Sequence, residues 1–476
     1  MTPQPPETNV DAGTLPVGDR GSFSLDVEER TIPIAFRDWI GRLRTGDPGA
    51  LPSVLGLVVL GLIFMQVSDA FLSRYNVGNL PGQGAYIAVI AMGLVFVLLL
   101  GEIDLSAGTA GGVAAGVAAI GIFHGKLNGQ LPDLLYWSLV VGLALAALLA
   151  AYLKAWTGAA VIVIGLVLVA TNLTQYTIPG LIAAVCIGAA IGTLNGYLVA
   201  KVGIPSFVVT LALFLAWQGV VQFALKGQPV PVGQIDLWHD LAYGTLSVLW
   251  SWVFVLVLVG GYLAYTVLGS MRAKRAGLAH DALPLVLLRG GVLAAVALVI
   301  TALASQNRGL NRYRVVEGIP VPAAIVIVLM VACTLLLTKT TWGRHLYATG
   351  GNEEAARRAG IDVVHMKVTA FILCSAFGAF GVVMLASFQS SASLDLGGGN
   401  TLLFSVAAAV IGGTSLFGGR GKPRDAVIGA LVIVIIPNGL LLRPSLDPQW
   451  QQVATGVVLL LAAAVDAISR RRATRS

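Results

Sequence analysis

The sequence predicts an all-α protein that crosses a membrane many times. Two facts of composition support this fold class: 57% of the 476 residues are hydrophobic, and only 11% are charged. A soluble domain averages about 25% charged residues, so this chain has too few to cover a water-exposed surface. The third observation is a series of apolar runs, many close to the roughly 20 residues that a helix needs to cross a bilayer. The lipid bilayer is therefore the expected solvent.

The apolar runs predict a polytopic bundle of about 12–14 transmembrane helices. The weakest signals are residues 157–173 and 402–417, which are short and interrupted by Gly or Thr. Glycines at four-residue spacing, Gly108, Gly112 and Gly116, predict a smooth helix stripe for close packing against a neighbour. The candidate spans are 53–72, 84–100, 105–122, 134–153, 157–173, 178–200, 205–224, 246–268, 285–304, 320–337, 367–388, 402–417, 425–442 and 452–468.

The positions of lysine and arginine predict the orientation of the bundle. If the N-terminus is inside, 22 of the 30 Lys and Arg residues lie in or beside inner segments, and 7 lie in outer segments. Cytoplasmic loops carry such an excess, so both termini are expected on the cytoplasmic side. The same rule explains the formal net charge of +7, and no nucleic-acid partner is expected.

Residues 1–45 are predicted to lie outside the transmembrane domain, which covers residues 46–470. Residues 1–30 are polar and rich in Pro, Gly and acids, which predicts a disordered tail. They contain no apolar h-region, so no cleavable signal peptide is expected. The segment Ile34–Arg44 is amphipathic and basic, and could lie on the inner membrane surface. Residues 471–476 are expected to form a cytoplasmic tail.

Two parts of the chain resemble each other and suggest an internal repeat. Residues 97–119 and 408–430 each contain an apolar run, a glycine step, a Ser or Asp beside a leucine, and a new span. Each copy is followed by an Asn-Gly pair within a span, at Asn195-Gly196 and Asn438-Gly439. Both glycine motifs fall on the predicted inner side, so the repeat would be parallel, as in some transporters. Coincidence in a chain rich in Gly and Ala is the alternative.

Two carboxylates interrupt the apolar pattern within residues 101–108, GEIDLSAG. A buried charge is costly in lipid and is usually functional or paired, and glycines permit a helix break whose backbone lines a cavity. A short cytoplasmic turn, in which Asp104 caps the next helix, fits the residues equally well. Glu102 and Asp104 could serve both roles.

A long inner loop, residues 341–367 within the predicted cytoplasmic segment 338–367, carries a charged cluster. Glu353–Ala359 should form a short helix with Asn352 as its cap, two acids in its first turn and Gly360 at its end. Such a helix between two spans suits the docking of a cytosolic partner. A solvated loop without a partner would show the same features.

Several polar side chains lie within predicted spans and could hydrogen-bond a hydroxyl-rich substrate. Each could equally bond a neighbouring helix, which is the commoner role for any single residue. Trp217 could stack on a sugar face, although an interfacial anchor is the commoner role. The polar candidates are Asn195, Gln218, Gln222, Gln389, Ser405, Thr414, Ser415 and Asn438.

The motifs of common catalytic and metal sites are missing from the sequence. No G-x-x-x-x-G-K-[ST] occurs, so the chain is not expected to hold ATP in a P-loop. No H-E-x-x-H or C-x-x-C occurs, and the three cysteines, Cys186, Cys333 and Cys374, stand in apolar runs as small core residues. No enzymatic activity, metal or cofactor is expected.

Four motifs in order give the chain a resemblance to a known family. They are EIDLSAG (102–108), TLNGYLVAKVGIPSFVVTL (193–211), TWGRHLYATGGNEEAARRAGIDV (341–363) and VIGGTSLFGGRG (410–421). With them the chain, from about Arg74 to Arg472, resembles the permease subunits of bacterial ATP-binding-cassette importers for monosaccharides, the ribose, galactose and xylose class.

Within that family the chain looks most like the xylose-type permeases. The features that carry this are the basic segment MRAKRAGL (271–278) and the sequence Gly318–Pro322. The chain departs from the family in two places: an extra apolar hairpin at about 134–173 and the basic stretch RGKPRD (420–425). The hairpin makes a span count taken from the family unsafe.

The resemblance implies a division of labour in the bacterial inner membrane. A cytosolic ATPase would dock on the 341–367 loop, an extracytoplasmic binding protein would deliver the sugar, and two permease copies would form the path. The implied coupling residues are Gly343, Arg344, Gly351, Asn352, Glu354, Ala355, Ala356, Gly360 and Ile361. The candidates for the substrate path are Glu102, Asp104, Ser106, Asn195, Gln218, Gln222, Gln389, Thr414, Ser415 and Asn438.

Three other hypotheses fit parts of the sequence. In a secondary transporter, Glu102 or Asp104 would be the proton or sodium site, and no ATPase would be needed. A membrane-embedded enzyme would need clustered His or acidic residues at a membrane face, and none is evident. A permease of the same superfamily for branched-chain amino acids would share the architecture and differ in substrate.

Overall fold

A computed structural model describes residues 29–44, 51–278, 280–309 and 315–442, together with six positions between 449 and 460. The described residues are almost entirely helical, with four two-residue strands, so the all-α prediction is confirmed. Outside the described residues lie residues 1–28 of the predicted tail 1–30, the predicted tail 471–476 and most of the predicted span 452–468.

Ten helices among the described residues are long and apolar enough to cross a membrane, and three apolar helices are shorter. All thirteen coincide with predicted spans, and two of the short ones are the spans with the weakest sequence signals. The short helices are α2 (Leu51–Val67), α6 (Trp156–Ala170) and α16 (Asn400–Gly412). The long helices are α3 (Arg74–Leu99), α4 (Ala107–His124), α5 (Asp133–Tyr152), α7 (Thr177–Tyr197) continued by the π-helical turn η2 (Leu198–Val202), α8 (Ser206–Ala224), α10 (Val248–Arg275), α11 (Leu283–Ala304), α12 (Val321–Lys339), α15 (Val363–Phe388) and α17 (Pro423–Leu441).

The chain divides into two compact units, of which the smaller comprises residues 1–41 and 253–300. In the smaller unit, β1 (Glu29–Arg30) pairs in parallel with β3 (His280–Asp281). The predicted amphipathic segment is helical, because α1 spans Ile32–Arg44.

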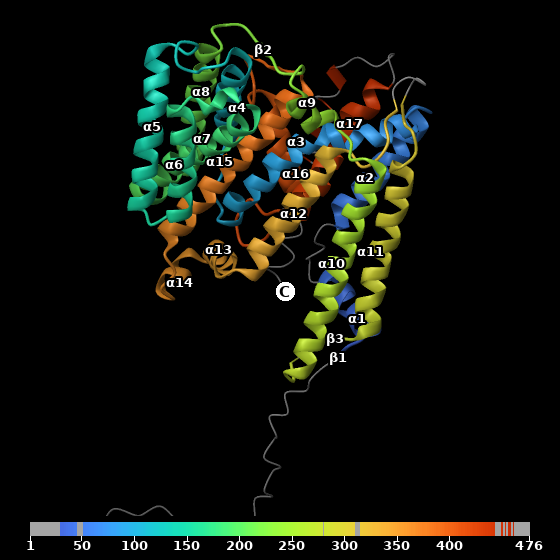
Figure 1. Cartoon of the computed structure of the whole chain (residues 1–476). Coiled ribbons are helices and arrows are strands. Elements are labelled where there is room, and N and C mark those ends of the chain that lie inside the picture. Colours follow the sequence, from blue (N-terminus) through green and yellow to red (C-terminus); the bar gives the residue numbers. More distant parts are fainter. Residues whose placement is uncertain are drawn as a thin grey trace, which may run out of the picture. The chain divides into compact units, whose positions relative to one another are not determined.

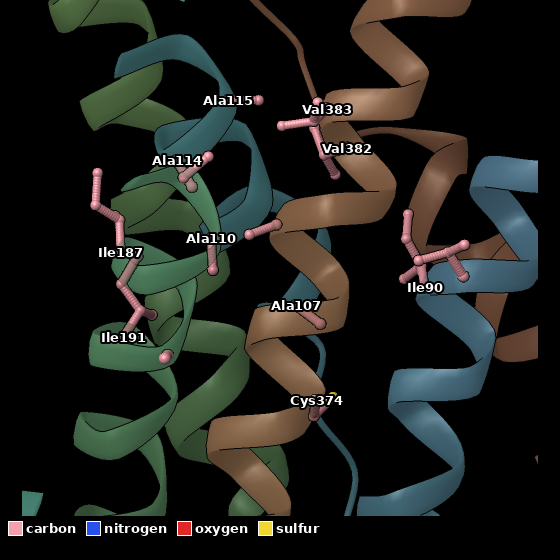
Figure 2. Close-up of a cluster of buried hydrophobic side chains, with 14 of the residues drawn as sticks. Ile90, Ala107, Ala110, Ala114, Ala115, Ile187, Ile191, Cys374, Val382 and Val383 are labelled. Carbon is pink, nitrogen blue, oxygen red and sulfur yellow. The ribbon is translucent and has the colours of Figure 1, made fainter. Parts of the chain in front are cut away.

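The larger unit, residues 42–252 and 301–476, is built around α15. This helix packs most extensively against α7, α3 and α4. Figure 2 shows it between Ile90 of α3 on one side and Ala107 and Ala110 of α4 on the other. These inner helices are largely buried, whereas α5 and α8 bury only about a fifth of their apolar stretch. A membrane helix exposed in this way presents its side chains to lipid, which explains why the outer helices are as apolar as the inner ones.

Short elements lie at the two ends of this unit. Figure 1 shows α13 and α14 at one end, and α9 and β2 at the other. Strand β2 pairs antiparallel with β4. The short elements are η1 (Leu173–Gln175), β2 (Val230–Pro231), α9 (Asp236–Tyr243), α13 (Thr341–Gly351), α14 (Glu353–Arg358) and β4 (Ser391–Ala392).

Small residues allow the inner helices to touch backbone to backbone. A Cβ on Gly192 of α7 would lie 2.8 Å from the Cα of Ile372, and one on Gly196 would lie 2.7 Å from the Cα of Val368, both in α15. Without a hydrophobic driving force in lipid, such close van der Waals packing is a main source of association between helices. The close packing of α7 against α15 therefore depends on these glycines.

The predicted glycine stripe on α4 is confirmed at two positions and wrong at the third. Gly108 and Gly112 face the backbone carbonyls of Gly397 and Leu396, so the neighbour is the segment after β4 and not a helix. Gly116 has no atom within 4 Å of a built Cβ. Spacing shows which side chains share a face, but it does not show where the neighbour on that face ends.

Candidate functional site

Three sequence motifs that lie far apart in the chain meet at one place, which we call the motif junction. It consists of residues 99–106 after α3, residues 343–351 of α13, and residues 413–421 between α16 and α17. Gly419 N donates a hydrogen bond to Leu99 O at 2.8 Å, and the Tyr347 hydroxyl donates to Gly421 O at 2.6 Å. The two glycine motifs of the suspected repeat therefore touch each other, at the end of the bundle that carries α13.

Close backbone contact explains the glycines of the motif junction. A Cβ on Gly350 would lie 3.1 Å from Gly419 N and closer still to the carbonyl of Leu99. Gly418 has a φ of +86°, and a Cβ there would lie 3.0 Å from Gly101 N. Both the left-handed conformation and the missing space exclude larger residues at Gly418.

Asp104 is completely buried and joins three helices. Its Oδ1 accepts hydrogen bonds from Ser106 N at 2.9 Å and from Ser106 Oγ at 2.7 Å. Its Oδ2 lies 3.5 Å from Asn195 Nδ2 of α7 and 3.5 Å from Ser375 Oγ of α15. Asn195 Nδ2 also donates to Ser106 Oγ at 2.8 Å. The structure thus brings together the predicted residues Asp104, Ser106 and Asn195, and adds Ser375.

These bonds bear on the two interpretations of the motif at 101–108. Asp104 accepts the backbone N–H of Ser106, the N-cap residue of α4, so it closes a short turn directly before the helix, while the predicted capping of α4 by Asp104 is wrong, because no side chain caps that helix. Burial raises the pKa of the Asp104 carboxyl, and the hydrogen bonds from Ser106 oppose this rise. The hydrogen bonds of Asp104 join the turn before α4 to α7 and α15, so the residue fixes the junction in place.

Glu102, two residues before Asp104, belongs to a different network. Its Oε1 lies 2.9 Å from Lys367 Nζ in the second turn of α15, and the same ammonium lies 3.0 Å from Glu353 Oε2 of α14. Glu353 Oε1 in turn accepts from Arg357 at 2.9 Å. A chain of alternating charges therefore runs from α14 to the segment before α4. No sequence signal singled out Lys367, which is one lysine at the edge of an apolar run.

The predicted inner loop is mostly helical, which corrects part of the prediction. The expected short helix is confirmed as α14: Asn352 accepts from Ala355 N at 2.9 Å, and Gly360 follows the helix with a φ of +84°. The eleven residues of α13 were expected as loop, because three of them are glycines. Thr340 nevertheless caps α13 by accepting from Gly343 N at 3.0 Å, and tight packing replaces the missing helix propensity.

The implied coupling residues fall into two groups. Gly343 and Ala356 are buried and hold α13 and α14 against the bundle, and Ile361 is half-buried. The remaining six form an exposed surface on these helices and the turn between them: Arg344, Gly351, Asn352, Glu354, Ala355 and Gly360.

Asn438 is not part of the same cluster as Asn195. Asn438 and Asn76 exchange two side-chain hydrogen bonds of 2.8 Å, and Asn438 Nδ2 lies 3.2 Å from Gln83 Oε1. Asn76 and Gln83 belong to the first turns of α3, whereas Asn195 bonds the segment after its last turn. The two Asn-Gly pairs therefore lie at opposite ends of α3 and are not equivalent positions of a parallel repeat. The repeat as a whole stays a prediction.

The other path candidates are dispersed. Gln222 is exposed on α8, and Gln389, exposed at the end of α15, accepts from Ser393 at 3.2 Å. Gln218 is half-buried on α8. Thr414 and Ser415 belong to the third segment of the motif junction, where Ser415 N donates to Arg420 O at 2.8 Å. Ser405, in α16, donates to Thr401 O of its own helix at 2.8 Å.

Two apolar cavities lie elsewhere in the larger unit. One, of about 370 Å³, is lined by α4, α5, α7 and α8 and includes the half-buried Trp217. The other, of about 550 Å³, is lined by α6, α7, α12, α13 and α15. The hairpin at 134–173 supplies one wall of each. None of the path candidates lines either cavity, and the three cysteines are buried as expected.

Comparison with known proteins decides the family. The model of a family described as the permease component of the branched-chain amino acid transport system matches residues 159–463. The chain belongs to this permease family. Members are transport subunits, and together with ten apolar helices in the described residues this makes the chain a multi-pass membrane transport protein. The predicted resemblance to permeases is confirmed.

Individual relatives of this permease extend the match beyond residues 159–463. The xylose transport system permease protein XylH of Escherichia coli is 30% identical over 88% of this chain and 92% of its own length. XylH of Haemophilus influenzae is 29% identical over 87% and 95%. The ribose import permease protein RbsC of Escherichia coli is 26% identical over 87% and 92%. No solved structure matches the chain.

Proposed function

We propose that the chain is the membrane permease subunit of an ATP-binding-cassette importer that moves a monosaccharide, xylose or a related sugar, by alternating access. The observation that carries this proposal is its similarity to the XylH proteins over nearly their whole length. In this proposal the bacterial inner membrane holds the chain, with both termini cytoplasmic, as the 22-to-7 distribution of basic residues predicts.

The partner for α13 and α14 in this proposal is a cytosolic ATPase subunit. Helix α14 buries only Ala356 and presents both charge signs outward, with the Glu354–Arg358 ion pair almost fully exposed. An exposed pair of this kind adds little stability, so its charges are free to face a partner. Hydrolysis would take place on that ATPase, because the chain has no P-loop.

The substrate side of the proposal needs two more components. An extracytoplasmic binding protein would deliver the sugar to the end of the bundle that carries α9 and β2, and a second copy of the permease would complete the path. The dispersed polar residues of one chain support this, because Gln218, Gln222 and Gln389 do not form a closed site by themselves.

Uptake of radiolabelled xylose tests the proposal. Uptake is compared between cells that lack the chain and the same cells with the chain restored. One set of cells is depleted of ATP, and a second set is treated with an ionophore. Uptake that needs the chain and ATP, and survives the ionophore, is the expected result. Uptake abolished by the ionophore while ATP remains would favour the secondary transporter and refute the proposal.

Branched-chain amino acids form the second candidate substrate class, because the matching family is described by their transport. Labelled leucine in the same cells separates the two. Leucine uptake that depends on the chain, without xylose uptake, would replace the sugar by an amino acid and leave the ATP-driven mechanism intact.

A further inference from the structure

We infer that Lys367 is the positioning residue that transmits a movement of α14 to the start of α4. The inference rests on the proposed function, in which α14 is the contact for an ATPase. It assigns the mechanical connection between that contact and the helices of the path to one ammonium group and its two carboxylate partners.

The geometry places Lys367 between two segments that have no other strong bond to each other. Its Nζ lies 2.9 Å from Glu102 Oε1 and 3.0 Å from Glu353 Oε2. Glu353 is the first residue of α14, and Ala356 is the only residue that α14 buries. Because α14 has so little apolar contact, this ion pair is its main polar attachment to α15.

Burial makes this network stiffer than an ordinary surface pair. The side chains of Lys367 and Glu102 are 14% and 16% exposed and that of Glu353 is 43% exposed, whereas those of Glu354 and Arg358 in the neighbouring pair are 74% and 79% exposed. Water and salt screen the exposed pair, but they screen the buried pair much less. A displacement of Glu353 would therefore move the Lys367 ammonium and change the strength of its ion pair with Glu102.

One face of α15 holds both acids of the motif at 101–108. Lys367 and Ser375 are eight residues apart, which places them on the same side of the helix. Lys367 binds Glu102, and Ser375 Oγ lies 3.5 Å from the carboxylate of Asp104. Asp104 binds Ser106, the residue directly before α4, so a shift of Glu102 relative to α15 would move the segment that enters α4.

The movement then has a route through α4. Gly108 and Gly112 of α4 contact the backbone of residues 396–397, a segment that begins at the far end of α15. Interiors packed to this density do not deform continuously, and they shift as units. A displacement of Glu102 would therefore shift α4 as a whole and would not be confined to the segment before it.

A merely structural tie between α14 and α15 predicts something different. It would lower the stability of the protein when broken, and it would leave the stoichiometry of transport unchanged. Transmission predicts that the ATPase still binds and turns over, while hydrolysis no longer moves sugar. The ratio of ATP hydrolysed to sugar transported distinguishes the two roles.

The test uses inside-out membrane vesicles of the source cells with the full set of native subunits. In such vesicles import moves sugar out of the lumen. The experiment measures the [14C]xylose that leaves the vesicles and the [14C]xylose that they retain, together with the phosphate released from ATP. Lys367→Met keeps the aliphatic stem and removes the charge, Glu102→Gln removes one partner, and Lys367→Arg keeps the charge. Arg289→Met breaks a part-exposed ion pair with Asp281, outside α13 and α14, and is the matched control.

Lys367→Met and Glu102→Gln are expected to raise the ATP hydrolysed per xylose moved about tenfold, within the range of typical coupling between sites. Lys367→Arg and Arg289→Met are expected to stay near the wild-type ratio. The double variant should be no worse than either single one, because both changes break the same connection.

A wild-type ratio in both Lys367→Met and Glu102→Gln would overturn the inference. If Lys367→Met does not accumulate, Glu102→Gln decides alone, because it leaves the Lys367–Glu353 pair intact. Failure of the proposed function looks different: wild-type vesicles would then move xylose without hydrolysing ATP, or not move it at all, and the inference would fall with the proposal.

Discussion

Replacing Gly350 with alanine is expected to open the motif junction, and the structure gives the size of the disturbance. The new Cβ would lie 2.8 Å from the carbonyl carbon of Leu99, closer still to its oxygen, and 3.1 Å from Gly419 N. Ordinary contact begins at 3.4 Å, and all these neighbours are backbone atoms that cannot rotate away. Helix α13 and the end of α3 must therefore move apart before an alanine fits between them.

The energetic cost of Gly350→Ala has two parts. Overpacking of a dense interior costs about 1–3 kcal/mol. The hydrogen bond from Gly419 N to Leu99 O, 2.8 Å long, would be strained or lost, which adds about 1 kcal/mol. Gly351→Ala is the matched control: no atom lies within 4 Å of its Cβ, and alanine favours the helix by about 1 kcal/mol.

Xylose uptake and thermal stability in detergent measure the two consequences. Gly350→Ala should melt at a clearly lower temperature and lose about 90% of uptake, since roughly 3 kcal/mol exceeds the 1.4 kcal/mol of a tenfold population change. Gly351→Ala should match or slightly exceed the wild type in melting temperature. Equal behaviour of the two variants in both assays would refute the close backbone contact between α13 and Leu99.

Three further outcomes are expected. Gly192→Ala should lower the melting temperature, because its Cβ would lie 2.8 Å from a Cα of α15, while Gly116→Ala, with open space around it, should not; equal melting would contradict the packing. Asp104→Ala should reduce the yield of folded protein more than Asp104→Asn, which keeps an oxygen for the two donors of Ser106; equal yields, measured by size exclusion, would contradict the role of Asp104 in holding the turn before α4. Glu354→Lys should leave the yield unchanged and abolish xylose uptake, since it places a like charge four residues before Arg358 on the exposed face; normal uptake would argue against docking there.

Local signals in the sequence were enough for the helices. Runs of apolar residues long enough to span a bilayer leave few alternatives, because backbone groups in lipid must be satisfied within a helix. The signals for helix α14 were also local, because its asparagine cap, the two acids in its first turn and the glycine at its end all fall within nine residues. Helix α13 was missed because its glycines argue against a helix, and only packing at Gly343 and Gly350 explains them.

The candidate site could be predicted only in part, because its bonds cross large separations in sequence. Asp104 and Asn195 were each singled out, but nothing local shows that their side chains meet, 91 residues apart. Ser375 and Lys367 lie on an apolar helix whose neighbours are set by close packing of glycines, which spacing alone does not define. The predicted equivalence of Asn438 and Asn195 was wrong for the same reason. The two residues share a sequence motif, but the partners of Asn438 are Asn76 and Gln83.

The two kinds of contact in the motif junction suit different tasks. The backbone of Gly350 lies directly against the backbones of Leu99 and Gly419. This contact resists sliding of α13 against α3, because no side chain lies between them that could rearrange. The ion pairs of Lys367 resist separation but tolerate rotation, since an ammonium has three equivalent donors. A junction stiff on one side and pivoting on the other would turn a push on α14 into a tilt of α4. In the proposed function, such a tilt of α4 would contribute to alternating access.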